Sequence, residues 1–500
     1  MTIELVRARQ VVAGVADRFT VDLLDDAAVA HDAGRIVAVD RFDALRPLYP
    51  EAAVTAFPHH MLLPGFVNAH HHVGLTPLQL GSPDLPLELW FASRLSARDV
   101  DPYLDTLYGA FEMIASGVTC VQHLHPRVAG PVEAVVAGCT TVLDAYRRVG
   151  MRASFAYSVR EQNRIVYGDD AAFCASLPSD IGHALMAHLQ RFALSFDDQM
   201  QVYAALRDAH KDASRTRIQL APANLHWVTD DGLMAMVAQA GADDVPLHMH
   251  LLETPYQREY ARRRTGTSAV KHLHRLGALG PSTTLGHAVW VDQEDIELIA
   301  HTATCVCHNC SSNLRLRSGT APLNRLAQKG VVTALGIDEA GLDDDRDMLQ
   351  EMRLALRLHR VPGMDPADVP TCPQVLRMAT EHGAATTPYR GQIGRLAPGL
   401  RFDAVAIDFD AATWPFQDRQ VAPLDALMQR AKPQHVDTVF VDGDPIYSKG
   451  RFKYVDRDAV LAEIAERMAQ PLSDVEVQRR RMAAAVMPHV QAFYAGYLRD

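Results

Sequence analysis

Between residues 61 and 340, short apolar runs rich in β-branched residues alternate with stretches whose apolar residues recur at helical spacing. This alternation is typical of parallel strands joined by helices. Eight strands, each followed by a helix, predict an α/β fold of the (β/α)8 or TIM barrel type. We expect the eight strands to end near His70, His123, Val159, Ala221, His250, His287, Val306 and Asp338.

Helical stretches separate these strands, and two of the clearest cover residues 131–148 and 347–360. Residues 168–215 are too long for one ordinary crossover. We therefore expect an additional pair of helices in that segment.

Both ends of the chain show another pattern, in which short strands are separated by Gly and Asp turns. The expected strands cover residues 3–6, 11–13, 28–31, 35–39, 403–407 and 436–441. Either end alone is small for an independent domain. The pattern predicts a small β-sandwich built from residues 1–60 and 391–455, a barrel over 61–390, and a helical C-terminal tail over 456–500, with helices at 458–468 and 474–498.

Composition narrows the class of protein. The chain is 48% hydrophobic and 22% charged, which is typical of a soluble globular protein. Its formal charge of −11 and lack of a basic patch argue against a nucleic-acid partner. Apolar runs stay below the roughly 20 residues of a membrane span, and no leader peptide opens the chain. Seven scattered cysteines favour a reducing, cytoplasmic location.

Polar side chains at the predicted strand ends form a candidate metal site. Alternate residues of a strand share a face, so His70 and His72 would point the same way. The carboxyl ends of barrel strands meet at one end of the barrel, where His250, His287 and Asp338 would join them. Imidazoles with one carboxylate suit Zn²⁺ and Fe²⁺. The alternative is that each histidine is a hydrogen-bonded strand-end residue without a metal.

Several segments together resemble the amidohydrolase superfamily, specifically its branch of metal-dependent deaminases and chlorohydrolases. This branch includes cytosine, guanine and S-adenosylhomocysteine deaminases and the triazine hydrolases. The resemblance runs from the N-terminus to about Lys453 and is poorly specific for substrate. The matching segments are PGFVNAHHH, HMHLLET, TLGHAVW, HNCSSNLRLRSGTAPL and ALGID, followed by GQIGRLAPGLRFDAVAID and VDTVFVDGDPIY.

The resemblance implies a role for each residue of the candidate site. His70, His72, His250 and Asp338 would bind one divalent ion, with Zn²⁺ the first choice and Fe²⁺ the alternative. Relatives with two metals carry a lysine at the end of the fourth strand, and residues 217–224 contain none. Glu253 would carry the proton of the attacking water to the leaving nitrogen. His287 would contact the water or substrate, and Asp338 would also orient the water.

Further polar residues follow the second, third and fourth strands, on loops that face substrate in a barrel. Arg160 could receive a carboxylate or carbonyl, and Trp227 could stack on a planar ring. Each of these residues could instead only support its neighbours. The expected substrate-binding residues are His123, His125, Arg160, Gln162, His226 and Trp227, with Asn163 and Asn224 close by.

Two segments depart from the family pattern. Cys305, Cys307 and Cys310 are spaced too tightly for paired zinc ligands, and no second pair lies near them in the sequence, so we expect no structural zinc there. Cys310 stands where the family has proline. Residues 339–347 form an acidic loop that could attract a cationic or amidine-like substrate, or could simply open a helix.

These observations predict a metal-dependent hydrolase that deaminates a planar amidine, guanidine or amino-heterocycle through water activated at the metal. The same site could instead serve dechlorination or the hydrolysis of a cyclic amide or urea. A non-catalytic, ligand-binding barrel is the alternative from another class, and Glu253 argues against it because binding alone has no need of a proton carrier. The expected partners are a small-molecule substrate and, from the helical tail and family analogy, further copies of the chain in a homodimer or homotetramer.

Overall fold

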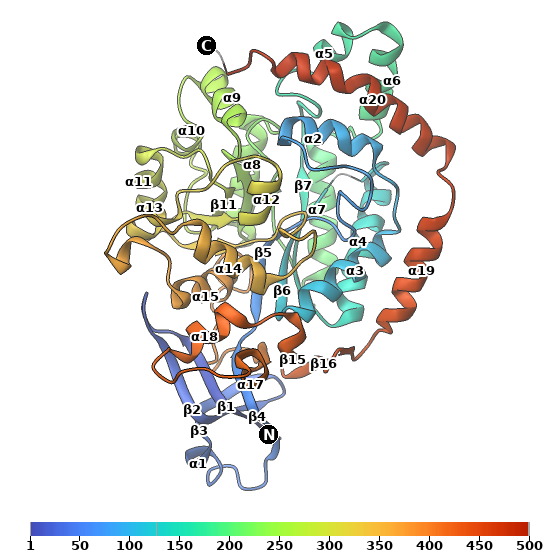
Figure 1. Cartoon of the computed structure of the whole chain (residues 1–500). Coiled ribbons are helices and arrows are strands. Elements are labelled where there is room, and N and C mark those ends of the chain that lie inside the picture. Colours follow the sequence, from blue (N-terminus) through green and yellow to red (C-terminus); the bar gives the residue numbers. More distant parts are fainter. Residues whose placement is uncertain (1, 127, 499–500) are drawn as a thin grey trace.

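A computed structural model describes residues 2–126 and 128–498 and confirms the predicted barrel (Figure 1). Its strands pair in parallel in two blocks, β5 to β8 with β9, and β10 to β13. Parallel bridges from Leu220 to Leu247 and from His71 to Asp338 join the blocks into a ring. The strands are β5 (Phe66–His71), β6 (Val118–His125), β7 (Arg152–Val159), β8 (Thr216–Ile218), β9 (Ala221–Pro222), β10 (Leu247–Leu251), β11 (Thr283–His287), β12 (Cys305–His308) and β13 (Thr333–Leu335).

Helices surround the barrel and cover its outer face (Figure 1). The predicted helices at 131–148 and 347–360 correspond to α4 (Val132–Val149) and α14 (Met348–Leu358). Gly150 ends α4 with a φ of 82°, a left-handed conformation that glycine adopts without steric cost. The long crossover carries extra helices, as expected. It contains α5 (Asp170–Ser176), α6 (Ser179–Gln190) and α7 (Phe196–His210).

The two chain ends pair in a second sheet below the barrel, because β4 lies antiparallel to β14 (Figure 1). All eight strands of this region are hydrogen-bonded into one continuous sheet in the order β17-β16-β15-β14-β4-β1-β2-β3. The two short strands expected before residue 14 are one strand, β1, whose register shifts at two bulges. The strands are β1 (Ile3–Val15), β2 (Val21–Asp32), β3 (Arg35–Arg41), β4 (Ala53–Pro64), β14 (Ala404–Asp408), β15 (Val436–Val441), β16 (Asp444–Ser448) and β17 (Arg451–Phe452).

A buried ion-pair network joins the barrel to this sheet. Arg152, at the start of β7, is fully buried, and its guanidinium lies 2.8 Å from carboxylate oxygens of Asp403 and Asp442. Removing one partner of such a buried pair typically costs about 3–5 kcal/mol, because the remaining charge loses its counter-charge. The network therefore holds the two parts of the chain in one arrangement.

The C-terminal tail forms α19 (Arg457–Ala469) and α20 (Asp474–Tyr494), which run along one side of the barrel and over its top (Figure 1). The hydroxyl of Tyr494 accepts a hydrogen bond from the backbone N–H of Tyr167, so the tail is packed on the barrel. The last two residues of the predicted tail lie outside the described residues. Within the part of the chain that the structure describes, no helix is long and apolar enough to cross a membrane.

Candidate metal and catalytic site

Three histidines and one aspartate meet at the carboxyl end of the barrel strands. The Nε2 atoms of His70, His72 and His250 lie 3.1 Å from one another. The Oδ1 atom of Asp338 lies 3.1 Å from His72 Nε2 and 3.6 Å from His70 Nε2. Four ligand atoms placed tetrahedrally about one zinc ion at 2.0–2.1 Å would be about 3.3 Å apart. The four residues therefore fit a single divalent ion.

The rings of these histidines are oriented by hydrogen bonds on their far side. His72 Nδ1 lies 2.6 Å from the carbonyl oxygen of Leu124, and His250 Nδ1 lies 2.8 Å from that of Ala223. An Nδ1–H that donates to a carbonyl leaves Nε2 with its lone pair directed at the cluster. Burial lowers the pKa of His250 well below its ordinary value, so this imidazole is neutral, as a metal ligand must be.

His70 is oriented by another histidine rather than by a carbonyl. Its Nδ1 atom lies 2.9 Å from Nε2 of His248, which is fully buried on β10. His248 precedes His250 by two residues, and the sequence analysis did not assign it a role. The same alternation that places His70 beside His72 could have revealed it, because alternate residues of β10 share a face.

Asp338 is held at the cluster by its backbone and by a serine. Its N–H donates to the carbonyl oxygen of His70, and its φ is 67°, an uncommon conformation for a residue other than glycine. Ser312 Oγ donates to Asp338 Oδ2 at 2.5 Å. Burial alone would raise the pKa of Asp338, but the hydrogen bond with His72 and the electrostatic influence of His72, His287 and His250 together outweigh it, and the pKa lies below its ordinary value. The carboxylate is thus ionised at neutral pH.

Glu253 and His287 lie beside the cluster of His70, His72, His250 and Asp338. The ring of His287 also comes close enough to His70, His250 and Asp338 to offer a metal-ligand atom. Glu253 is 3% exposed, and its Oε1 atom lies 3.7 Å from His287 Nδ1. Burial raises the pKa of Glu253 to about 7, even though Ser318 Oγ donates to it at 3.3 Å. His287 Nε2 lies 3.8 Å from Asp338 Oδ2. A carboxyl group with a pKa near neutrality can both take up and release a proton.

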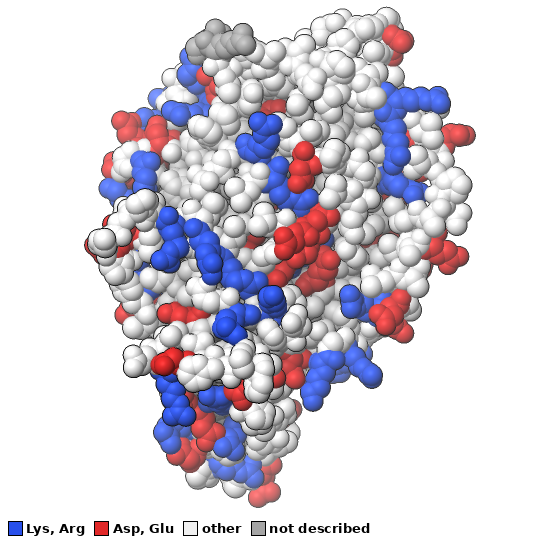
Figure 2. Space-filling view, in the orientation of Figure 1, with Lys and Arg blue, Asp and Glu red and all other residues white. Residues whose placement is uncertain are grey.

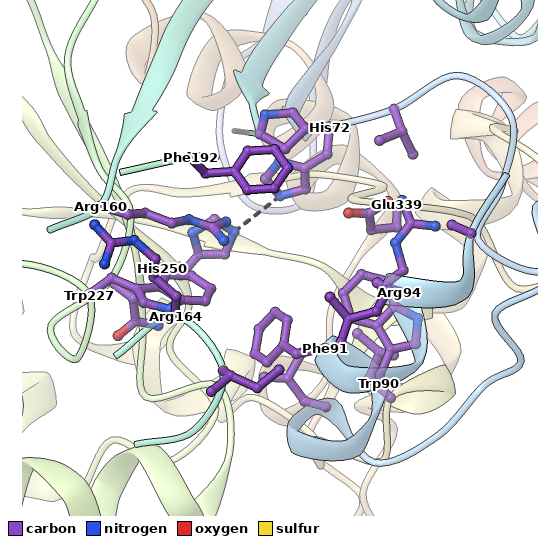
Figure 3. A pocket seen from close by; sticks show the side chains of 18 of the residues that line it. His72, Trp90, Phe91, Arg94, Arg160, Arg164, Phe192, Trp227, His250 and Glu339 are labelled. Carbon is purple, nitrogen blue, oxygen red and sulfur yellow. Dashed lines mark hydrogen bonds between the residues drawn. The ribbon is translucent and has the colours of Figure 1, made fainter. Parts of the chain in front are cut away.

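A cavity of about 370 Å³ opens above these residues and is lined by His72, His250, Glu253, His287 and Asp338 at its base. Aromatic and cationic side chains form its walls (Figure 3). Arg160 and Trp227 lie on one side, with the guanidinium carbon 3.7 Å from the centre of the indole ring. Trp90, Arg94 and Glu339 lie on the other side, as Figure 3 shows.

Comparison with known proteins establishes the family. The model of the amidohydrolase family matches residues 61–446. The chain belongs to the amidohydrolase family. A 5-methylthioadenosine/S-adenosylhomocysteine deaminase from Nitratidesulfovibrio vulgaris is 28% identical over 446 residues, which cover 89% of this chain and 92% of that protein. A 5'-deoxyadenosine deaminase from Methanothermobacter thermautotrophicus is 28% identical and covers 83% of this chain and 88% of its own length.

Solved structures show the same fold. An adenosine deaminase from Xanthomonas campestris with bound zinc is 25% identical, with a TM-score of 0.77 over 95% of this chain and 98% of that chain. An atrazine chlorohydrolase from Arthrobacter aurescens in complex with zinc is 20% identical, with a TM-score of 0.75 over 92% and 99%. The comparisons confirm the predicted barrel fold and the class of a metal-dependent hydrolase that acts on carbon–nitrogen bonds.

Two of the six residues expected to bind substrate line the cavity of this amidohydrolase, namely Arg160 and Trp227. The other four are absent from the lining. His123 bonds to the hydroxyl of Tyr146 at 2.8 Å and to His125 at 3.1 Å, so both rings pack beside the site. Gln162 donates to the carbonyl oxygen of His226, whose buried ring packs at a tilt between Tyr167 and Trp227. These four residues support the lining rather than form it.

The structure also adds cavity residues that the sequence did not indicate. Apart from Arg164, which lies in the loop after β7, they come from α2 (Leu87–Ser93), the turn η1 (Arg94–Ser96), the long crossover and α20, which are distant from the strand ends in the chain. On amphipathic helices, arginines and aromatic residues resemble ordinary surface positions. The added residues are Trp90, Phe91, Arg94, Arg164, Phe192 and Arg479.

The acidic loop at 339–347 is mostly tied into the fold. Asp344 pairs with Arg315 at 2.7 Å, and Asp347 accepts a hydrogen bond from Leu349 N at the start of α14. Among the acids of this loop, Glu339 is the one that lines the cavity. Acidic and basic side chains are interspersed over the face shown in Figure 2, and several acidic side chains lie together near its centre. Within this loop, Glu339 is therefore the acid placed to attract a cationic substrate into the cavity.

Proposed function

We propose that this amidohydrolase deaminates an amino-substituted heterocycle of the adenine type. The observation that carries the proposal is the position of Glu253, whose carboxyl has a pKa of about 7 and lies at the cavity base beside the His70, His72 and His250 cluster. A ligand-binding barrel would gain nothing from a buried acid with a pKa near neutrality at that position. Deaminases of adenine nucleosides among the relatives support the same reaction and substrate class.

We propose Zn²⁺ as the ion and Fe²⁺ as the alternative, with His70, His72, His250 and Asp338 as the ligands. When bound, such an ion lowers the pKa of water toward about 7 and stabilises negative charge on oxygen. Zinc in the Xanthomonas adenosine deaminase supports the first choice. A single ion fits because the segment at the end of the fourth strand carries Asn224 and no lysine.

The proposed roles of the protein residues follow from their protonation states. Water attacks the ring carbon that carries the amino group, and Glu253 takes one proton of that water. The ring C=N bond opens as the hydroxyl adds, and the ring nitrogen receives this proton from Glu253. Glu253 then takes the remaining hydroxyl proton and delivers it to the amino nitrogen, which leaves as ammonia while the C=O bond forms. Asp338 stays ionised because its pKa is low, and it orients the attacking water as a hydrogen-bond acceptor. His287, 3.8 Å from Asp338, stabilises the charge that develops on oxygen.

The cavity walls determine which heterocycle enters. A volume of about 370 Å³ suits a small organic molecule rather than a polymer. Phe91 and Trp227, which pack edge to face with ring centres 5.2 Å apart, give the cavity an aromatic wall suited to a planar base. Arg160 stacks on Trp227 and presents N–H donors to a carbonyl or an anionic substituent.

A substrate panel tests the proposal. The zinc-loaded protein would be assayed with adenine nucleosides, guanine, cytosine and chloro-triazines, with ammonia, chloride and carboxylic acid measured in parallel. We expect ammonia release from at least one aminopurine compound. Chloride or carboxylate release without ammonia would replace deamination with one of the alternative reactions. The homo-oligomeric state and the cytoplasmic location remain predictions for light scattering and cell fractionation.

A further inference from the structure

A second cluster of metal-ligand side chains lies outside the cavity, at the end of β12. His308, Cys310 and His359 each offer one ligand atom, and these atoms lie within 4.8 Å of one another. The Nε2 atoms of His308 and His359 are 2.8 Å apart. His308 and Cys310 are fully buried, and His359 is 6% exposed. None of the three lines the cavity or takes part in the proposed reaction.

Hydrogen bonding within the protein leaves this cluster incompletely satisfied. The Nε2 atoms of His308 and His359 face each other, so one of them donates a proton and the other accepts it. His308 Nδ1 is buried and has no hydrogen-bond partner among the described residues. Buried polar atoms without a partner are rare and costly.

We propose that His308, Cys310 and His359 form a second metal site, structural rather than catalytic, that takes Zn²⁺. Two imidazoles with one thiolate are a ligand set typical of zinc. A bound cation would stabilise the thiolate, which burial otherwise disfavours. Glu351 hydrogen-bonds with the Cys310 thiol and offers a carboxylate as a further ligand.

The sequence analysis expected no zinc at Cys305, Cys307 and Cys310, because it considered the cysteines as a set. The structure separates them. Cys305 and Cys307 are outside the cluster, and the additional ligand, His359, caps the distant end of α14. Cys310 takes the place of the family's proline, so this site would be a feature of this chain rather than of the family.

An ion at this site would brace the catalytic site through one short helix. Cys310 begins α12 (Cys310–Arg315), and Ser312 in the same turn donates to Asp338. Asn313, the next residue, has its Oδ1 atom 2.9 Å from His287 Nδ1. Fixing Cys310 therefore fixes the residues that orient Asp338 and His287.

Metal content of variants tests the proposal without relying on activity. The protein would be stripped with a chelator, reloaded with Zn²⁺, desalted and analysed by mass spectrometry. We expect about two equivalents per chain in the wild type and about one in His359→Gln, Cys310→Ser and the His70→Ala/His72→Ala double variant. Cys305→Ser is the control, because Cys305 is buried and lies on β12 with His308 but outside the cluster. This variant should keep about two equivalents of zinc. Unchanged zinc content in both His359→Gln and Cys310→Ser would overturn the proposal.

A measurement on the wild-type chain covers the case in which those variants fail to fold. Co²⁺ replaces Zn²⁺ and gives a thiolate-to-cobalt absorption band only when cysteine is a ligand. The catalytic cluster contains no cysteine. We therefore expect the band in the cobalt-loaded wild type and in the His70→Ala/His72→Ala variant. Cobalt-loaded wild type without this band would contradict the proposal.

Discussion

The base of the cavity and its walls are built in different ways. Base residues such as His70, His250 and Asp338 stand at or just beyond the carboxyl ends of β5, β10 and β13, and closure of the barrel brings them together. Wall residues such as Arg94 and Arg479 come from a turn and from the tail helix α20, which reach the cavity only through tertiary packing. The position of a base residue is thus a property of the barrel, whereas that of a wall residue depends on how distant helices pack.

The two regions also differ in how completely their polar atoms are paired. At the base, hydrogen bonds to carbonyl oxygens or to other side chains orient His72, His250 and Asp338. In the walls, one guanidinium nitrogen of Arg94 is buried without a hydrogen-bond partner among the described residues. Hydrogen bonds thus fix the orientation of these base residues more completely than that of Arg94.

The base should be the more sensitive region, and His250→Ala should have the largest effect. This change deletes one of the proposed ligands, so the metal content should fall together with turnover. We expect the activity of this variant to fall below detection. Chelation of the wild type should also abolish activity, and adding Zn²⁺ or Fe²⁺ should restore it. Metal analysis and ammonia release check both. His250→Ala with full metal content would remove His250 from the ligand set.

Glu253→Gln comes next, because it keeps the shape of the side chain but cannot carry a proton. Turnover should fall by about 10²–10⁴-fold, the usual contribution of general acid–base catalysis. The substrate KM should change little, because the amide keeps the size and polarity of the cavity base. Steady-state kinetics with ammonia detection measure both. A near-normal turnover would exclude Glu253 from the mechanism.

A wall variant should act on binding instead. Arg160→Gln removes a charged donor from the cavity, and losing a hydrogen bond of a charged group costs about 1.5–3 kcal/mol. We expect KM to rise by about 10–100-fold with a smaller change in kcat. Arg258→Gln, an exposed arginine on α9 (Pro255–Thr265), serves as the matched control and should be neutral. A kcat effect without a KM effect would place Arg160 with the base rather than the wall.

The smallest effect is expected from Ser312→Ala, which removes the hydroxyl that donates to Asp338. Variants of residues that orient metal ligands usually lose about 10–100-fold in affinity or activity, and we expect the lower end because Asp338 keeps its backbone bond to His70. Metal affinity measured by competition with a chelator is the readout. An unchanged affinity would show that the backbone alone positions Asp338.

The contrast between base and walls also explains what could be predicted from the sequence. The alternation of strand-like and helical stretches predicted the barrel, and the polar residues at or after strand ends placed His70, His72, His250, Glu253, His287 and Asp338, which the structure brings together. Trp90 and Arg94 carried no local signal, since helical residues facing a cavity resemble residues facing solvent. His359 could not be linked to Cys310 either, because only the packing of α14 against α12 brings them together.

Metal content and turnover measured on the same samples of Glu253→Gln test the central claim most directly. The account assigns metal binding to the histidine cluster and proton transfer to Glu253. It predicts a Glu253→Gln protein with metal content near that of the wild type and turnover lower by about 10²–10⁴-fold, whereas His250→Ala loses both. A Glu253→Gln protein that loses its metal, or one that keeps its turnover, would contradict the account.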